Sequence, residues 1–283
     1  MKGLYFCGIC FVAVIGVLPC KALLAEELPW EKKLPFENAT IHYAVSGVEQ
    51  GTEILYIRNF GREQATYLDS TTKIMGMAVS EKAVDFMDAD YVYSYDLQAQ
   101  EGTKSVNPQK YMTEAYSRLT PEEKKQVQEN VAQTGGALTG GMGGAVQENV
   151  AKILGYDCDK IDIMGGGATY LIHGTSIALK TEVNMMGMKM FTLATSVDTG
   201  KVDPQHFIHP KGIEAKANPE ADAMAQAMGQ QVMAALKDPE ARKIESGVGQ
   251  QNDALKKNMT EEDKQMLEQA GELLKGMQNI FGQ

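Results

Sequence analysis

The chain has 283 residues, 43% of them hydrophobic and 23% charged, a composition typical of a globular protein of one or two domains. Its 27 basic and 37 acidic residues give a formal net charge of -10, which disfavours nucleic acid and anionic membrane surfaces as partners. Three of the four cysteines lie among the first 20 residues, so Cys158 remains as a lone thiol. No intrachain disulfide framework is therefore expected, and apolar packing must hold the fold together.

Residues 1–25 are predicted to be a secretory signal peptide. A basic start precedes the uncharged apolar residues 4–18, and small residues offer cleavage points after Ala22 or Ala25. The apolar run is shorter than a membrane span, with a retained N-terminal anchor as the alternative. Cys20 lies about where a bacterial lipoprotein carries its acylated cysteine, so it is a candidate for lipidation. The alternative is ordinary cleavage of the signal peptide without lipidation. The expected location is the periplasm, either free or anchored at the outer membrane.

An extended, charged lead-in is expected at residues 26–37, where two prolines disfavour a helix. Short apolar or β-branched runs separated by Gly, Asp and Asn then predict an antiparallel meander. Its expected strands are 39–46, 52–59, 64–68, 72–79, 83–86 and 91–97. Residues 98–108 follow as a linker.

A helical segment is expected next. Thr120 is an N-cap residue, Pro121 occupies the first helical position and Glu123 is placed for a capping box, which predicts a helix to about residue 133. A shorter helix is expected over 109–118. The six glycines of 135–144 disfavour a stable helix there.

One hexapeptide, Val-Gln-Glu-Asn-Val-Ala, occurs twice, at 127–132 and at 146–151. A single recurrence is not a repeat architecture, and it indicates either a local duplication or two equivalent helical turns. A second helix is therefore predicted over 145–154.

The rest of the chain changes character once more. Runs separated by Gly- and Asn-rich turns predict a second antiparallel meander, with strands at 157–164, 168–173, 176–183 and 188–198. Residues 213–283 are predicted to be a helical hairpin tail, with helices at 219–237 and 260–281. The second has a continuous apolar stripe, formed by Met266, Leu267, Ala270, Leu273, Leu274, Met277, Ile280 and Phe281. This tail should pack on the sheet, on itself or on a partner.

The order of strands, helical insert and strands behind an export signal resembles the periplasmic lipoprotein-carrier superfamily, the LolA/LolB-like folds. The residues that carry the resemblance are Ile41 to Gly47, Glu53 to Ile57 with Phe60-Gly61, Tyr91 to Asp96, Gly155 to Cys158, and Phe207 with Pro210 to Gly212. The resemblance covers residues 38–212, including a helical glycine-rich insert at 108–154. It implies an α+β fold with a curved antiparallel sheet, a half-barrel closed by helices, whose concave side holds acyl chains.

Two sets of side chains are candidate ligand-lining residues. Tyr91, Tyr93 and Tyr95 share one face of a strand, where they would line a groove or simply pack against neighbours. Met186, Met188 and Met190 alternate along another strand. Thioethers in this arrangement can bind Cu(I), but methionine also fills irregular apolar surfaces, which is the interpretation we favour.

No motif of an enzyme is present. The chain lacks a nucleophile elbow, a His-Glu-x-x-His helix and a phosphate-binding loop. His206 and His209 have an H-x-x-H spacing, but no Cys or carboxylate pair completes a metal site with them. We therefore expect a protein without catalytic residues, cofactor or metal, which binds a lipid or other apolar ligand. The alternative is an envelope scaffold or assembly protein that binds a partner through residues 260–281.

Overall fold

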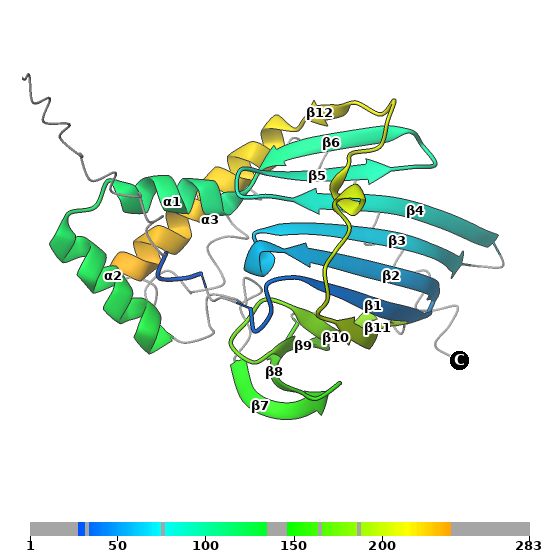
Figure 1. Ribbon diagram of the computed structural model, residues 1–283, viewed down its shortest axis with the longest axis horizontal. Coiled ribbons are helices and arrows are strands. Elements are labelled where there is room, and N and C mark those ends of the chain that lie inside the picture. The colour runs from blue at the N-terminus through cyan, green and yellow to red at the C-terminus, as the bar shows by residue number, and fades with distance from the viewer. Residues whose placement is uncertain are drawn as a thin grey trace, which may run out of the picture.

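The computed structural model describes residues 28–31, 34–74, 77–134, 146–163, 166–185 and 188–238. Within these ranges, twelve strands form one sheet, and three α-helices lie together at one end of it (Figure 1). The strands are β1 (Ala39–Gly47), β2 (Glu49–Arg58), β3 (Glu63–Ile74), β4 (Met77–Met87), β5 (Tyr91–Asp96), β6 (Glu101–Val106), β7 (Val146–Ile153), β8 (Tyr156–Asp162), β9 (Gly167–Ile172), β10 (Ala178–Met185), β11 (Met188–Asp198) and β12 (Ala215–Ala217). The helices are α1 (Pro108–Ser117), α2 (Pro121–Thr134) and α3 (Pro219–Lys237), with 3-10 turns η1 (Asn59–Gly61) and η3 (Pro204–Phe207).

The sheet consists of two antiparallel meanders joined at β1. Its order is β12-β6-β5-β4-β3-β2-β1-β11-β10-β9-β8-β7, so β1 pairs with β2 on one side and with β11 on the other. Only β12 and β6 run parallel among the described strands. β7 and β12 are the two edges, and the sheet does not close on itself. The expected α+β fold with a curved, mainly antiparallel sheet is confirmed.

Between residues 39 and 97, the first meander as described has five strands where six were expected. The runs at 64–68, 72–79 and 83–86 belong to two strands, β3 and β4, which pair along their whole length. Asp69 and Ser70 are therefore not a turn. Asp69 instead forms a cross-strand ion pair with Lys82, at 2.7 Å, so a polar pair in mid-strand resembled a turn signal.

The expected linker at 98–108 contains strand β6, which corrects the sequence prediction. β6 is polar and carries Gly102, so it lacks the apolar alternation of a strand. Its position depends on the neighbouring strand, because Gly102 lies under the ring of Tyr95. A Cβ atom there would approach Tyr95 Cδ1 to 2.7 Å. Gly102 thus makes room for a large ring on β5.

The helix predicted over 145–154 is wrong, because Val146–Ile153 is strand β7. The same hexapeptide is helical at 127–132 in α2 and extended at 146–151 in β7. Three other helix predictions are confirmed: α1 and α2 match 109–118 and 120–133, and α3 matches 219–237. The helix predicted over 260–281 lies outside the described residues. The strands of the second meander also match, as β8 to β11.

The largest apolar cluster joins the two meanders. It contains Ile41, Ile57 and Leu179, all with no exposed surface, together with Cys158. The lead-in takes part as well, since Leu34 and Phe36 are buried in this cluster and the Phe36 ring packs edge-on against Tyr156 at 6.2 Å. Burial raises the pKa of the Cys158 thiol, with its acidic neighbours Asp159 and Asp157 acting in the same direction, as expected for an inert thiol in the core.

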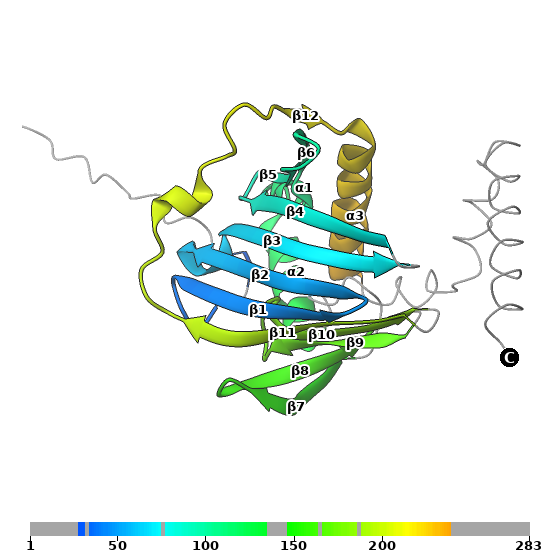
Figure 2. The same cartoon turned by 90° about the vertical axis from the view of Figure 1, so that its right-hand side faces the viewer.

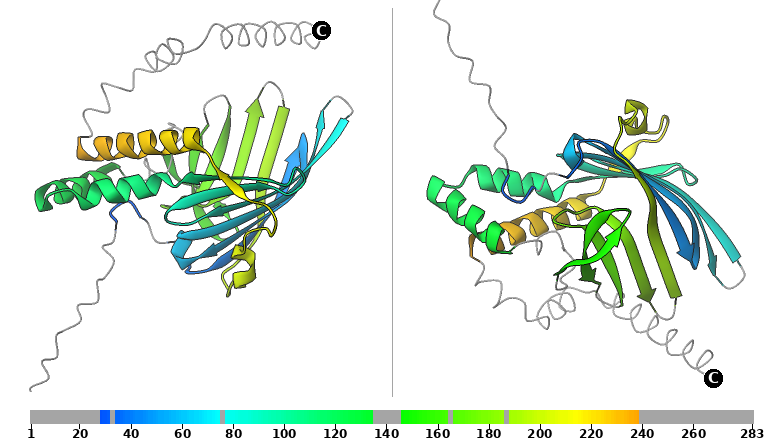
Figure 3. Two further views of the ribbon diagram at one scale, coloured as in Figure 1. Left: turned by 90° about the horizontal axis from the view of Figure 1, so that it is seen from above. Right: turned by 60° about the horizontal axis from the view of Figure 1, so that its bottom comes forward.

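A second cluster holds the three helices together. Tyr116 of α1, Val127 of α2 and Leu236 of α3 are fully buried in it. α1 and α3 run side by side (Figure 3), and Gly229 allows a close approach. A Cβ atom at Gly229 would lie 2.9 Å from Tyr111 Cβ. The first part of the predicted tail, β12 and α3, is therefore packed onto β6 and the insert helices.

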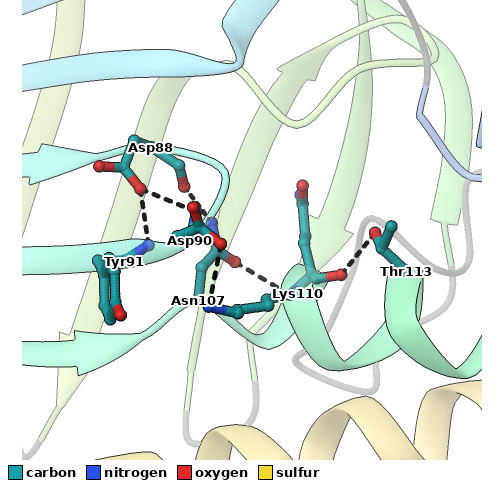
Figure 4. A network of polar contacts seen from close by, with 7 residues as sticks. Asp88, Asp90, Tyr91, Asn107, Lys110 and Thr113 are labelled. Carbon is teal, nitrogen blue, oxygen red and sulfur yellow. Dashed lines mark hydrogen bonds and ion pairs between the residues drawn. The ribbon is translucent and has the colours of Figure 1, made fainter. Parts of the chain in front are cut away.

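Asn107 fixes the junction between the sheet and the helices (Figure 4). This buried side chain accepts a hydrogen bond from Gln109 N at 3.0 Å as the N-cap of α1, and it donates one to the Asp88 carbonyl at 2.7 Å. Next to it, Lys110 Nζ lies 3.1 Å from Asp90 Oδ1. The turn between β4 and β5 and the start of α1 thus form one polar unit.

Candidate functional site

Strands β1 to β6 present two chemically different faces. They pair without a register shift, so opposed residues share a face and successive residues alternate. We call one face the strap face; it is defined by the opposed residues Tyr56, Ala65, Phe86 and Tyr93. We call the other the pocket face; it is defined by the opposed residues Tyr43, Glu53, Leu68 and Ala83.

Residues 199–214, the strap, cross the strap face on their way from β11 to β12 (Figure 2). The ring of His206 stacks on Tyr56, with 3.8 Å between ring centroids. The His206 carbonyl accepts a hydrogen bond from the Tyr67 hydroxyl at 2.9 Å. These contacts hold the first half of the strap against β2 and β3.

His209 anchors the second half of the strap. Its Nδ1 lies 2.7 Å from the Tyr95 hydroxyl, and its ring packs edge-on against Tyr93 at 4.5 Å. Burial lowers the pKa of His209; Asp88 opposes this effect and Lys104 adds to it. The fold therefore favours the neutral imidazole, in which Nδ1 can accept a hydrogen bond from the Tyr95 hydroxyl.

Tyr91, Tyr93 and Tyr95, predicted to line a ligand groove, all lie on the strap face. Tyr95 is 3% exposed and bonded to the strap. The Tyr91 ring lies under the ammonium group of Lys104, 3.5 Å from the ring centroid. Of the two roles considered for these tyrosines, packing accounts for their contacts.

The methionines lie on the opposite face from the tyrosines. Met190 opposes Gly47, which lies on the same side of β1 as Tyr43 because the two residues are four positions apart. Met190 is therefore on the pocket face. Met188 is two residues further along β11 and is 47% exposed. The tyrosines and methionines therefore do not line one common groove. Met186, Cys20 and residues 260–281 lie outside the described residues.

A pocket of about 240 Å³ opens on the pocket face. The curvature of the sheet brings the loop between β9 and β10 over β1 to β3, and the Tyr43 hydroxyl donates a hydrogen bond to the Ala178 carbonyl at 2.8 Å. Its lining combines apolar, hydroxyl and amide groups with the carboxylate of Glu53: Tyr43, Glu53, Leu55, Gln64, Ser176, Ile177, Ala178, Lys180, Thr181 and Thr192. The ammonium group of Lys180 lies on the other side of β10, over the Tyr170 ring. Such a mixture can hold an amphiphilic group.

Glu53 is the ionisable group that distinguishes this pocket. Its side chain is half-buried and makes no hydrogen bond or ion pair with any part of the chain that the structure describes. Burial raises the pKa of Glu53, and the carboxylates of Asp85 and Glu49 raise it further. No sequence motif marks this residue, which lies in an ordinary strand.

Charge is sorted between the two faces of β1 to β6. The acidic residues of the pocket face are Glu49, Glu53, Glu81, Asp85, Asp96 and Glu101. All lysines and arginines of these six strands as described lie on the strap face: Arg58, Lys73, Lys82 and Lys104. Lys180 of the pocket lining comes from β10, where it forms an ion pair with Glu182. No basic side chain from β1 to β6 as described therefore neutralises the pocket face.

Ser70 adds an unsatisfied group to the same face. It opposes Gly51 on one side and Glu81 on the other, and it is 2% exposed. Its hydroxyl has no hydrogen-bond partner among the described residues. Buried hydroxyls are normally paired, so this one needs an explanation.

A separate acid and histidine pair lies in the second meander, and sequence reasoning missed it. Asp159 is buried, and its carboxylate contacts His173 Nδ1 at 2.7 Å, Gly174 N at 3.0 Å and Asn149 N at 2.9 Å. Burial alone would raise the pKa of Asp159, but these hydrogen bonds outweigh it and the pKa lies below its usual range. Two of the three bonds go to backbone, so we assign the pair to holding β7 and the turn after β9.

Other site types find no support in the described ranges. The described residues contain no group of three or more His, Cys, Asp and Glu side chains placed to hold a metal ion. None of their helices combines the length and the apolar character needed to cross a bilayer. His206 and His209 contribute to the strap contacts described above.

The solved structures compared with this chain are similar to it at low sequence identity. No family model and no curated protein matches the chain. It is similar to an uncharacterized conserved protein from Thermus thermophilus, with 11% identity, 63% of this chain and 91% of that chain covered, and a TM-score of 0.36. It is also similar to PNGF-II, with 14% identity, 69% of this chain and 33% of that chain covered, and a TM-score of 0.35. The chain thus spans about a third of PNGF-II, and neither similarity carries an argument about function.

Proposed function

We propose that this is an exported, non-enzymatic protein of the cell envelope that binds a lipid or other apolar ligand. In this proposal the sheet acts as a half-barrel with the helices at one end, and the ligand lies on the pocket face. The protein would reside in the periplasm or be anchored at the outer membrane through its N-terminus.

The observation that carries the proposal is the pocket together with exposed apolar side chains on the same face. Leu55 and Ile177 supply apolar wall to the pocket. Towards the ends of the strands, Met77, Val79 and Met188 are 67%, 62% and 47% exposed. Their register places them on the pocket face. Exposed apolar groups that gather on one face are typical of binding surfaces.

Native mass spectrometry with lipid extraction tests the proposal on protein purified from an envelope fraction. A co-purifying lipid supports it. In a second assay, the neutral fluorescent probe N-phenyl-1-naphthylamine is titrated into the protein. We expect Val79→Ser to weaken probe binding and Leu193→Ser, an equally apolar and 43% exposed position on the opposite face, to leave it unchanged. Probe binding that is absent, or equally affected by both variants, would contradict the proposal.

The alternative function is an envelope scaffold that binds a partner through residues 260–281. In this alternative the partner surface would extend onto α3, where Met224 and Met228 lie one turn apart and are 67% and 47% exposed. A chain truncated after Asp238 discriminates between the two functions. If it remains folded and binds the probe but loses a partner recovered with the full chain, the scaffold function is supported.

A further inference from the structure

We propose that the pocket face selects ligands that carry a cationic amine, which Glu53 binds, and disfavours anionic ones. This inference rests on the proposed function and names the chemical class of its ligand: an amphiphile with an ammonium group and an apolar chain.

The first argument is the unpaired carboxylate. Burying an ionised carboxylate without a partner costs free energy, and nearby like charges add to this cost. Glu53 is half-buried, and Asp85 and Glu49 are the acids that act on it. All lysines and arginines of β1 to β6 as described point to the strap face, and Lys180 of β10 is paired with Glu182. An ammonium group from a ligand would remove this cost, whereas a carboxylate or phosphate would increase it.

The second argument is the buried hydroxyl of Ser70, which is independent of the acids. Ser70 lies two residues along β3 from Leu68, the residue that opposes Glu53. Diagonal neighbours of this kind are roughly 7–8 Å apart. An ammonium group has three donors and no acceptor. Ser70 therefore places an unpaired acceptor oxygen one diagonal step from Glu53; it does not line the pocket in this structure, so an ammonium group reaches it only after a local side-chain movement.

The third argument is size. A pocket of about 240 Å³ is small, since pockets for drug-sized ligands span roughly 300–1,000 Å³. It can hold the amine-bearing end of a ligand but not a long chain. The chain would then extend over the exposed Val79 and Met77 on the same face.

The test compares three probes of equal chain length, decylamine, decanol and decanoate, by titration calorimetry at neutral pH on the full mature protein. We expect decylamine to bind about tenfold or more tighter than decanol, because a charge-assisted hydrogen bond is stronger than a neutral one, and decanoate to bind weakest. Glu53→Gln should abolish this preference. The control variant Asp69→Asn removes an exposed carboxylate of the strap face and should retain the preference for decylamine.

The outcomes separate this inference from the proposed function. Equal binding of decylamine and decanol to wild type would overturn the inference and leave apolar binding intact. A preference that survives in Glu53→Gln, with its fold verified by circular dichroism, would also overturn it. Absence of binding by all three probes would overturn both. Butylamine tests whether the apolar chain is needed. If it binds as tightly as decylamine, a free small amine suffices as ligand, and the proposal of an amphiphilic ligand is overturned.

Discussion

Replacing Tyr95 by phenylalanine should loosen the strap without leaving a cavity in the sheet. The substitution keeps the ring that packs over Gly102 and against Phe86. It removes only the hydroxyl that lies 2.7 Å from His209 Nδ1. Because the hydroxyl is buried, its loss leaves the imidazole nitrogen without its partner. We expect a loss of about 1–2 kcal/mol in the free energy of unfolding.

Protonation of His209 should act on the same contact, with a defined sign. Its pKa is lowered in the folded protein, so the folded state favours neutral imidazole. As pH falls below about 6.5, the ordinary histidine value, the unfolded state takes up a proton first and stability decreases. Burial is the largest cause of the lowered pKa, so Tyr95→Phe should retain this acid sensitivity while lowering stability at both pH values.

Denaturant unfolding at pH 7.5 and pH 5.5 measures both effects, and hydrogen exchange of residues 199–214 shows whether the strap is the part that opens. Tyr91→Phe is the matched control. Tyr91 lies on the same strand and face, and among the described residues its hydroxyl has no hydrogen-bond partner. Equal stability of the two variants at both pH values would refute the argument that this hydroxyl anchors the strap.

Three further substitutions test the remaining parts of the structure. Glu53→Gln should stabilise the protein at neutral pH by roughly 0.5–2 kcal/mol, because the raised pKa of Glu53 means that the fold disfavours the ionised carboxylate. In thermal unfolding, this gain in stability should shrink as the pH falls towards the ordinary pKa of a glutamate. Asp159→Asn should lower the free energy of unfolding by about 1–3 kcal/mol. Because the pKa of Asp159 is lowered in the folded protein, the wild type should lose this stability as pH falls through that pKa, whereas the variant should not. Stability measured during an acid titration would show the difference. Asn107→Ala should cost about 1–3 kcal/mol through the lost cap and the unpaired Asp88 carbonyl, with Thr113→Ala, an exposed side chain bonded to the Gln109 carbonyl, as a near-neutral control in hydrogen exchange.

The repeated hexapeptide shows where local sequence stops determining structure. In α2, Val127 and Val131 lie one turn apart and are buried against α1 and α3. In β7, the corresponding Val146 and Val150 lie on an edge strand, and Val150 is 46% exposed. There Asn149 adopts a φ of 53° and donates its N–H to Asp159. The same six residues take both forms because their neighbours differ, and propensity cannot supply that information.

The site illustrates the same limit. Alternation within a strand correctly predicts that Tyr91, Tyr93 and Tyr95 share a face, but strand pairing is needed to decide what covers that face. Glu53 and Asp85 are distant in sequence and become neighbours only through the register of β2, β3 and β4. An isolated glutamate in an apolar run carries no motif. Its role becomes visible once the pairing shows that basic residues of the same strands are on the other face.

The pairing of β1 with β11 also has a consequence for how the chain folds. Every other antiparallel pair in the described sheet joins strands adjacent in sequence, whereas this seam joins Thr40 to Asp198 and Gly47 to Met190. Contacts of such long sequence separation carry most of the loop-closure entropy and slow folding. Each meander can form locally, but the cluster around Ile41 and Leu179 is complete only after the seam closes. We therefore expect the closure of this seam to be the slow step of folding, and the pocket, which is lined by residues of both meanders, to form only with that step.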